Sequence, residues 1–247
     1  MTPEDAAGAA AGPIGALGGA FMTARPTLKK GPELGFPKGW SFYFAGRGGV
    51  LGDVVPDVVA AAFGFFPPAF VREQWLVGRG VMEPSAAAAA YAEACQDWGR
   101  EHLDGAEGLD RLVELLKIVV SEADGAGAPL FAGWRAMPLP EDVPGSAAQL
   151  LHVMREHRGA MHIMGVLTEG LTPHEAVMCG GGHGNVEFFQ WPEPHPDPEP
   201  LYEQYNAAEE VTDLLAARAF EVLDEAERAE LVDLLGAAQI KAFNLAV

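Results

Sequence analysis

The chain has 247 residues, of which 49% are hydrophobic, and its formal net charge is −19. The apolar content is sufficient for a substantial core and excludes a disordered protein, while the negative charge opposes binding to nucleic-acid backbones and to anionic lipid. Cys95 and Cys179 are the two cysteines, so no disulfide framework is expected and a reducing cytoplasm fits. No apolar run approaches the roughly 18 residues of a membrane span. We therefore expect a soluble protein that binds neither membranes nor specific DNA.

Proline and glycine divide the sequence into four parts. Residues 1–30 open acidic, lack a basic segment and are rich in glycine and alanine, so we expect a flexible leader and not a signal peptide. Residues 31–190 are expected to form a helical core domain with a pocket. Residues 191–200 should be an extended linker, because alternate prolines forbid a helix. Residues 201–247 are expected to form acidic C-terminal helices.

Hydrophobic periodicity favours a mainly α protein, and the strand signal is weak. The periodicity predicts helices over residues 54–63, 85–103, 109–123, 146–168, 203–217 and 224–242. A further short helix is expected after Thr172, because Thr172-Pro173-His174-Glu175 has the form of a capping box. The glycine-rich residues 180–184 are expected to form a flexible turn.

The segment 146–168 combines the pattern of a core helix with charged side chains. At about 100° per residue, Arg155, Arg158 and His162 fall within roughly 60° of one another, opposite the main apolar face. Gly159, which costs a helix about 1 kcal/mol relative to alanine, would let a ligand or another backbone approach closely. Because the flanking residues are apolar on nearly every side, we expect this helix to be buried. Its arginines then need partners, and a carboxylate or phosphate on a ligand would serve.

The alternative for this segment is a solvated face. Arg155 and Arg158 would then pair with some of the many carboxylates of the chain, and such pairs contribute little to stability. His157 lies on the Met-rich side of the expected helix and is interpreted as an ordinary core histidine.

Residues 40–66 form a second candidate region. The run Gly46-Arg47-Gly48-Gly49 suggests a nucleotide-binding loop, but it lacks the Lys-Ser/Thr of a P-loop and the Gly-x-Gly-x-x-Gly spacing. A glycine-rich turn that leads into a helix is the simpler interpretation. Arg47 lies beside Tyr43 and above an expected helix N-terminus, where anions bind readily. The aromatic side chains here, Trp40 and Phe66 among them, form either core or the wall of a pocket.

The expected helix 146–168 carries three histidines, His152, His157 and His162. They recur every five residues, which places them about 140° apart around a helix, so they cannot converge on one ion. His152 and Glu156 do have the four-residue spacing of a ligand pair, and Cys179 and His183 could supply further ligands from a flexible loop. We therefore expect no bound metal, with a metal or haem enzyme as the alternative. The sequence identifies no cofactor.

Several motifs together carry a resemblance. They are Tyr-Phe-Ala-Gly-Arg and Val-Val-Ala-Ala-Ala-Phe within residues 39–66, Arg155-Glu156-His157-Arg158-Gly159 with His162, Gly170-Leu171, and Glu210 with Thr212-Asp213. Across most of residues 35–240 the chain resembles a large actinobacterial family generally described as helix-turn-helix or MarR-like. Arg-Glu-His-Arg-Gly-x-x-His is the most specific element. The resemblance implies a mostly helical domain related to winged-helix proteins, often dimeric, and implies no established reaction.

The chain departs from that family where DNA binding would lie. Typical members place a helix-turn-helix and a wing between a Gly-x-x-Trp element and the Thr-Asp element. Here the interval from Trp191 to Thr212 is much shorter and rich in proline. We therefore expect the wing and recognition region to be shortened.

Two functions stay open. The first is a small-molecule binding protein on a regulator-like helical scaffold, expected to be a homodimer. The second is an enzyme, for example a metal- or haem-dependent enzyme of secondary metabolism, that uses His162 as general acid or base and the arginines to stabilise negative charge. The candidate catalytic residues are His162, Arg155 and Arg158, and the candidate ligand-binding residues are Arg47, Tyr43, Trp40, Phe66, Glu156 and Gly159.

Overall fold

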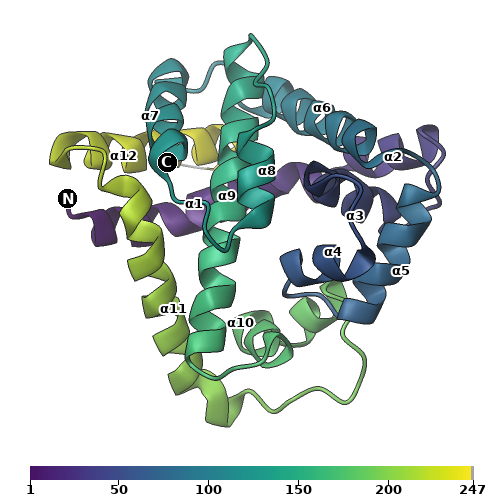
Figure 1. Ribbon diagram of the computed structural model, residues 1–247. Coiled ribbons are helices and arrows are strands. Elements are labelled where there is room, and N and C mark those ends of the chain that lie inside the picture. The colour runs from purple at the N-terminus through teal and green to yellow at the C-terminus, as the bar shows by residue number, and fades with distance from the viewer. Residues whose placement is uncertain (246–247) are drawn as a thin grey trace.

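A computed structural model describes residues 1–245 of the chain (Figure 1). Its α-helices are α1 (Pro3–Thr23), α2 (Arg25–Glu33), α3 (Ser41–Gly48), α4 (Pro56–Ala62), α5 (Pro68–Arg79), α6 (Pro84–His102), α7 (Leu109–Glu122), α8 (Pro129–Arg135), α9 (Val143–Thr168), α10 (Pro173–Phe188), α11 (Tyr202–Ala217) and α12 (Glu225–Phe243). Short 3-10 helices lie at Gly49–Leu51, Glu199–Leu201 and Arg218–Phe220. The described residues contain no strand, which confirms the mainly α prediction and leaves this part of the chain without the β-hairpin wing of winged-helix proteins.

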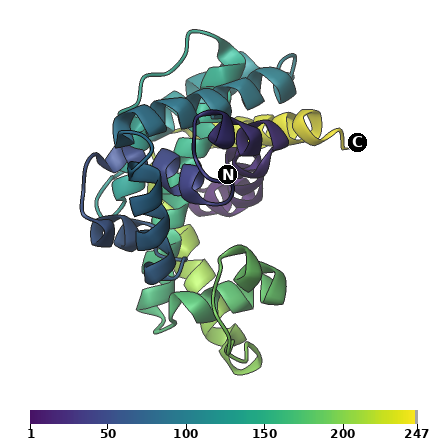
Figure 2. The ribbon, with the colours of Figure 1, turned by 90° about the vertical axis from the view of Figure 1, so that its right-hand side faces the viewer.

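The long helix α9 is the centre of the fold. It runs through the middle of the molecule in Figure 1 and packs against α1, α6, α7, α8 and α11. Residues 145–154 are all buried, as the apolar pattern predicted. The second half of α9, with α10 and the first part of α11, forms the lower part of the molecule in Figure 2. The central helix therefore joins the main core to this lower part.

Two glycines set how closely other helices approach α9. A methyl group on Gly18 of α1 would lie 2.5 Å from the carbonyl oxygen of Leu151. A methyl group on Gly165 of α9 would lie 2.5 Å from the carbonyl oxygen of Ala208 in α11. Because real side chains do not tolerate such distances, only glycine allows α1 and α11 to lie this close to α9.

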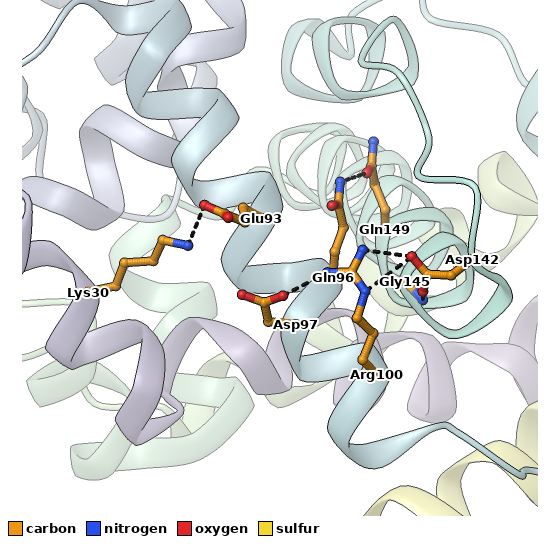
Figure 3. Close-up of polar contacts among 8 residues, drawn as sticks. All are labelled: Lys30, Glu93, Gln96, Asp97, Arg100, Asp142, Gly145 and Gln149. Atoms are coloured by element: carbon orange, nitrogen blue, oxygen red, sulfur yellow. Dashed lines mark hydrogen bonds and ion pairs between the residues drawn. The ribbon is translucent and has the colours of Figure 1, made fainter.

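Polar contacts with α6 hold the N-terminal half of α9 (Figure 3). Asp142 caps α9 by accepting a hydrogen bond from the Gly145 amide at 2.8 Å. Arg100 of α6 donates to the same carboxylate at 2.7 and 3.1 Å. One turn earlier in α6, the Gln96 amide donates to Gln149 at 2.9 Å. These contacts fix the register of α9 and so the positions of the side chains further along it.

The expectation of a flexible leader over residues 1–30 was wrong. These residues form α1 and most of α2, and α1 begins with a capping box between Thr2 and Asp5. Its buried side chains belong to the main core and include Ala6, Ala10, Ile14, Leu17 and Phe21. Burial against several other helices outweighs the cost of glycine in a helix, which is about 1 kcal/mol per residue.

Most other expected helices are confirmed. The segments 85–103, 109–123, 203–217 and 224–242 correspond to α6, α7, α11 and α12, and the capping box at Thr172 begins α10. The turn expected at residues 180–184 corresponds to a kink at Gly182, whose non-helical φ of 61° and ψ of −148° divide α10 into two helical segments. No helix in residues 1–245 has the length and apolar character that crossing a membrane would require.

Candidate functional site

A cavity of about 330 Å³ lies beside the second half of α9. Side chains from α1, α3, α8, α10 and α11 and from the segment around the end of α4 complete its wall. The apolar part of the wall includes Ile14, Phe63, Phe65, Phe66, Leu130, Ile163 and Phe189. The polar part includes Tyr43, Arg47, Arg155, Glu156, Arg158, His162, Asn185, Tyr205 and Glu209.

The structure brings together most of the candidate residues in this cavity. Arg155, Arg158 and His162 line it along one side of α9, as the helical spacing predicted. Arg47, Tyr43, Phe66, Glu156 and Gly159 line it as well. A methyl group on Gly159 would meet no atom within 4 Å, so the glycine faces open space and no other backbone.

Trp40 does not line the cavity, contrary to expectation. Its indole packs edge-on against Tyr43 at 5.3 Å and against Phe188 at 5.2 Å between ring centroids. It belongs to the aromatic cluster behind the wall, so it supports Tyr43 and would not contact a ligand directly.

Arg47 and Glu156 form a buried ion pair at the wall of the cavity. The guanidinium donates to both carboxylate oxygens at 2.7 and 2.8 Å and to the Tyr43 hydroxyl at 2.7 Å. Burial alone would raise the pKa of Glu156, but the charge and hydrogen bonds of Arg47 lower this pKa to about 2. Burial likewise opposes the charge of Arg47, yet Glu156 and Tyr43 raise the arginine pKa above its ordinary value. Both groups are therefore ionised.

The surroundings of Arg47 differ from those expected. It lies in the last turn of α3, not above a helix N-terminus, and all three of its nitrogens are used by Glu156 and Tyr43. The Gly46–Gly49 run is the end of α3 and the start of a 3-10 helix, so it forms no phosphate-binding loop. Arg47 is a fixed part of the wall.

Arg155 is the least compensated arginine of the cavity. Its contact with Glu156 is 3.4 Å, and that carboxylate is already held by both arms of Arg47. Within residues 1–245, Glu156 is the one carboxylate that Arg155 contacts. Two guanidinium groups thus share one carboxylate, which leaves positive charge at this end of the cavity.

Arg158 is paired within the protein. It donates to Asp213 at 2.7 Å and to Glu209 at 3.1 Å, both on α11. Its side chain is 21% exposed, so these two ion pairs are half-buried. They match neither a fully solvated face nor a buried arginine that is left for a ligand. The guanidinium fixes the two carboxylates and has little capacity left for a ligand anion.

His162 occupies the same end of the cavity as Arg158. Its Nδ1 lies 3.1 Å from the Thr212 hydroxyl, and its Nε2 lies 3.7 Å from Oε1 of Glu209. The ring stacks on Phe65 with centroids 5.0 Å apart. Burial lowers the pKa of His162, Arg158 lowers it further, and Glu209 opposes the shift. The imidazole is therefore neutral at pH 7.

Tyr205 and Glu209 were not identified as candidate site residues from the sequence. The Tyr205 hydroxyl donates to Oε1 of Glu209 at 2.9 Å, and burial together with Glu209 raises the pKa of this tyrosine. Tyr205, Glu209 and Asp213 recur every four residues and so share one face of α11. That spacing is the signal from which the polar face opposite Arg158 could have been found.

The other two histidines of α9 lie outside the cavity. His152 is fully buried between Phe21 and Trp134, and burial lowers its pKa to about 3. His157 is buried against Phe131, where burial and then Arg135 lower its pKa to about 4. In the described part of the chain, no group of three or more His, Cys, Asp or Glu side chains is arranged to hold a metal ion.

Residues 7–195 match a helix-turn-helix family. Since the match covers most of the sequence, the chain belongs to this family. No curated protein and no solved structure matches it.

Proposed function

We propose that the protein binds a small molecule in the cavity beside α9. Ligand pockets commonly have volumes of about 300–1,000 Å³, apolar walls and a few placed polar groups. The cavity fits this description, with its phenylalanines and the charged residues of α9 and α11. The observation that carries the proposal is Arg155, a guanidinium at the cavity wall that shares its one carboxylate with Arg47.

This incomplete compensation indicates the chemistry of one end of the ligand. A carboxylate or phosphate placed against Arg155 would neutralise the second guanidinium and would accept two parallel hydrogen bonds from its planar fork. The apolar body of the ligand would then lie along the phenylalanine wall. Gly159 supports this arrangement, because the space that its missing side chain leaves belongs to the cavity.

An enzymatic function is the second candidate, and His162 favours it. A neutral imidazole at a cavity wall is able to take a proton from a bound substrate, and Arg155 would stabilise the negative charge that develops. Arg158, which is held by two carboxylates, would position Glu209 and would not contact the reacting atoms.

We also propose a MarR-like ancestry, a homodimeric state and a cytoplasmic location for the protein. The resemblance to MarR-like proteins of actinobacteria supports a scaffold descended from a transcriptional regulator and a homodimeric state. The absence of a disulfide between Cys95 and Cys179 supports a place in the cytoplasm. Sedimentation of the purified protein tests the dimer directly.

Native mass spectrometry of the protein as purified tests the binding function. We expect a bound small molecule that is lost when Gly159→Phe fills the cavity. Gly236→Phe is the matched control, because Gly236 in α12 also has no atom near its missing methyl group and does not line the cavity. A protein that carries no small molecule and shows the same spectrum in both variants would contradict the proposal. If the native protein converts this molecule to a product of different mass and the His162→Ala variant does not, the enzymatic function is favoured.

A further inference from the structure

The hydroxyl of Thr212 determines which nitrogen of His162 carries the proton. This hydroxyl donates its one hydrogen to the carbonyl oxygen of Ala208 at 2.6 Å. A carbonyl can only accept, so the Thr212 oxygen has only lone pairs left for His162 Nδ1, 3.1 Å away. The imidazole nitrogen must therefore be the donor. Neutral His162 is the Nδ1–H tautomer, and its Nε2 is a hydrogen-bond acceptor at the cavity wall.

Two acceptors consequently face each other across this end of the cavity. Nε2 of His162 and Oε1 of Glu209 are 3.7 Å apart, which is too long for a direct hydrogen bond. Glu209 is held in place by Tyr205 on Oε1 and by Arg158 on Oε2. Because both atoms are hydrogen-bond acceptors, a ligand group that donates two hydrogens would form one hydrogen bond with each of them.

The charge of the surroundings selects among such donors. Glu209 and Asp213 bring two carboxylates to this end, and Arg158 supplies one guanidinium for both. With His162 neutral, this end of the cavity carries excess negative charge, while the Arg155 end carries excess positive charge. A protonated amine donates several hydrogens and also supplies the missing positive charge, whereas a hydroxyl supplies neither a second hydrogen nor a charge.

We propose that the end of the cavity formed by His162 and Glu209 binds a protonated amine of the ligand. The inference rests on the proposed binding function and adds the ligand class, an amine joined to an anionic group through an apolar body. Arg155 and His162 are seven residues apart on one side of α9, or about 10 Å along the helix axis. The amine and the anion would be separated by a comparable distance. Thr212 is a positioning residue, since it acts through the imidazole.

Calorimetric titration with two matched probes tests the proposal. Aminooctanoate that carries its amine on the terminal carbon has nearly the same shape as nonanoate. The two probes differ at that end, which is an ammonium group in the first and a methyl group in the second. We expect the amine compound to bind at least about tenfold more tightly. Glu209→Gln should remove most of this advantage, while Glu210→Gln, an exposed neighbour outside the cavity, should leave it unchanged.

The outcomes separate this inference from the proposed function. If both probes bind the native protein equally and neither binds the Gly159→Phe variant, the cavity binds small molecules and the amine inference is wrong. If neither probe binds, the ligand class is also wrong, and mass spectrometry of the purified protein still decides whether the cavity holds a ligand.

Nitrogen NMR of the histidine rings gives a readout that needs no ligand. We expect neutral His162 to be protonated at Nδ1 in the native protein and in Thr212→Ser, which keeps the hydroxyl. In Thr212→Val, which keeps the shape and loses the acceptor, the proton should move toward Nε2 and the preference for the amine probe should fall. A native His162 protonated at Nε2 would overturn the inference.

Discussion

The buried pair of Arg47 and Glu156 couples the stability of the protein to the shape of its cavity. Their side chains are 11% and 1% exposed, and removal of one partner leaves an uncompensated buried charge. We expect Arg47→Met or Glu156→Gln to lower the free energy of unfolding by about 3–5 kcal/mol. Urea denaturation of each variant measures the loss.

The double variant Arg47→Met/Glu156→Met is the control for this prediction. Two apolar side chains replace two charges, so its stability should lie within a few kcal/mol of the native protein and above that of either single variant. Tyr43, which loses its donor, accounts for a residual cost of about 1 kcal/mol. Single variants as stable as the native protein would show that the pair is solvated.

Arg155 should distinguish a charge requirement from a geometric one. Lysine keeps the positive charge and loses the planar fork that holds a carboxylate through two hydrogen bonds. We expect Arg155→Lys to weaken nonanoate binding at least about tenfold, or about 1.4 kcal/mol. The exposed Arg25 supplies the control Arg25→Lys. Native affinity in Arg155→Lys would mean that the fork is not used.

At the scale of single residues, the sequence predicts where a side chain lies on its helix better than it predicts the residue with which that side chain pairs. Helical spacing placed Arg155, Arg158 and His162 along one cavity wall, because a helix fixes the direction of each side chain. The same spacing does not say which of 35 acidic residues reaches each arginine. Arg47 of α3 reaches Glu156, and Arg158 reaches Glu209 of α11, only in the folded chain, so these pairs are a tertiary property.

Two glycines of α9 should respond in opposite ways to the same substitution. At Gly159 a methyl group meets no atom, so Gly159→Ala should raise the free energy of unfolding by about 0.5–1 kcal/mol through helix propensity. It should also weaken nonanoate binding, because the methyl group enters the cavity. Thermal and urea denaturation together with titration check both effects.

Gly165→Ala is the internal comparison. Its methyl group would lie 2.5 Å from the Ala208 carbonyl oxygen, and the helices would have to separate at a cost of about 1–3 kcal/mol. If both alanine variants change stability in the same direction, the helix crossing is looser than described. A gain at Gly159 without loss of binding would mean that the ligand lies elsewhere.

At the scale of elements, most helices after residue 80 were predicted and the glycine-rich helix α1 was not. The capping boxes at Thr172 and Asp224 mark the starts of α10 and α12, and these signals are local. In α1, the glycines are unfavourable for a helix by local criteria, yet Gly18 permits the close approach to α9. Its stability depends on residues far away in the sequence, and the capping box of Thr2 and Asp5 was a local signal of its start.

At the scale of the whole molecule, membership in a helix-turn-helix family does not lead us to expect DNA binding. The net charge of −19 repels a phosphate backbone, and the described residues carry no wing. We expect no selective gel retardation of genomic fragments at about 150 mM salt. Retardation of one fragment that random DNA competes poorly would contradict this prediction.

The place of α1 in the core has a consequence for how the protein is made. Its partners include α9, α11 and α12, and the Arg228 side chain in α12 donates to the carbonyl oxygen of Met1 at 2.9 Å. During synthesis α1 leaves the ribosome before α9, α11 and α12, so its apolar face stays uncovered until these helices follow. Such late pairing slows folding and exposes the nascent chain to aggregation. The cavity, whose wall includes Ile14 of α1 and Tyr205 of α11, is completed only after α11 has left the ribosome.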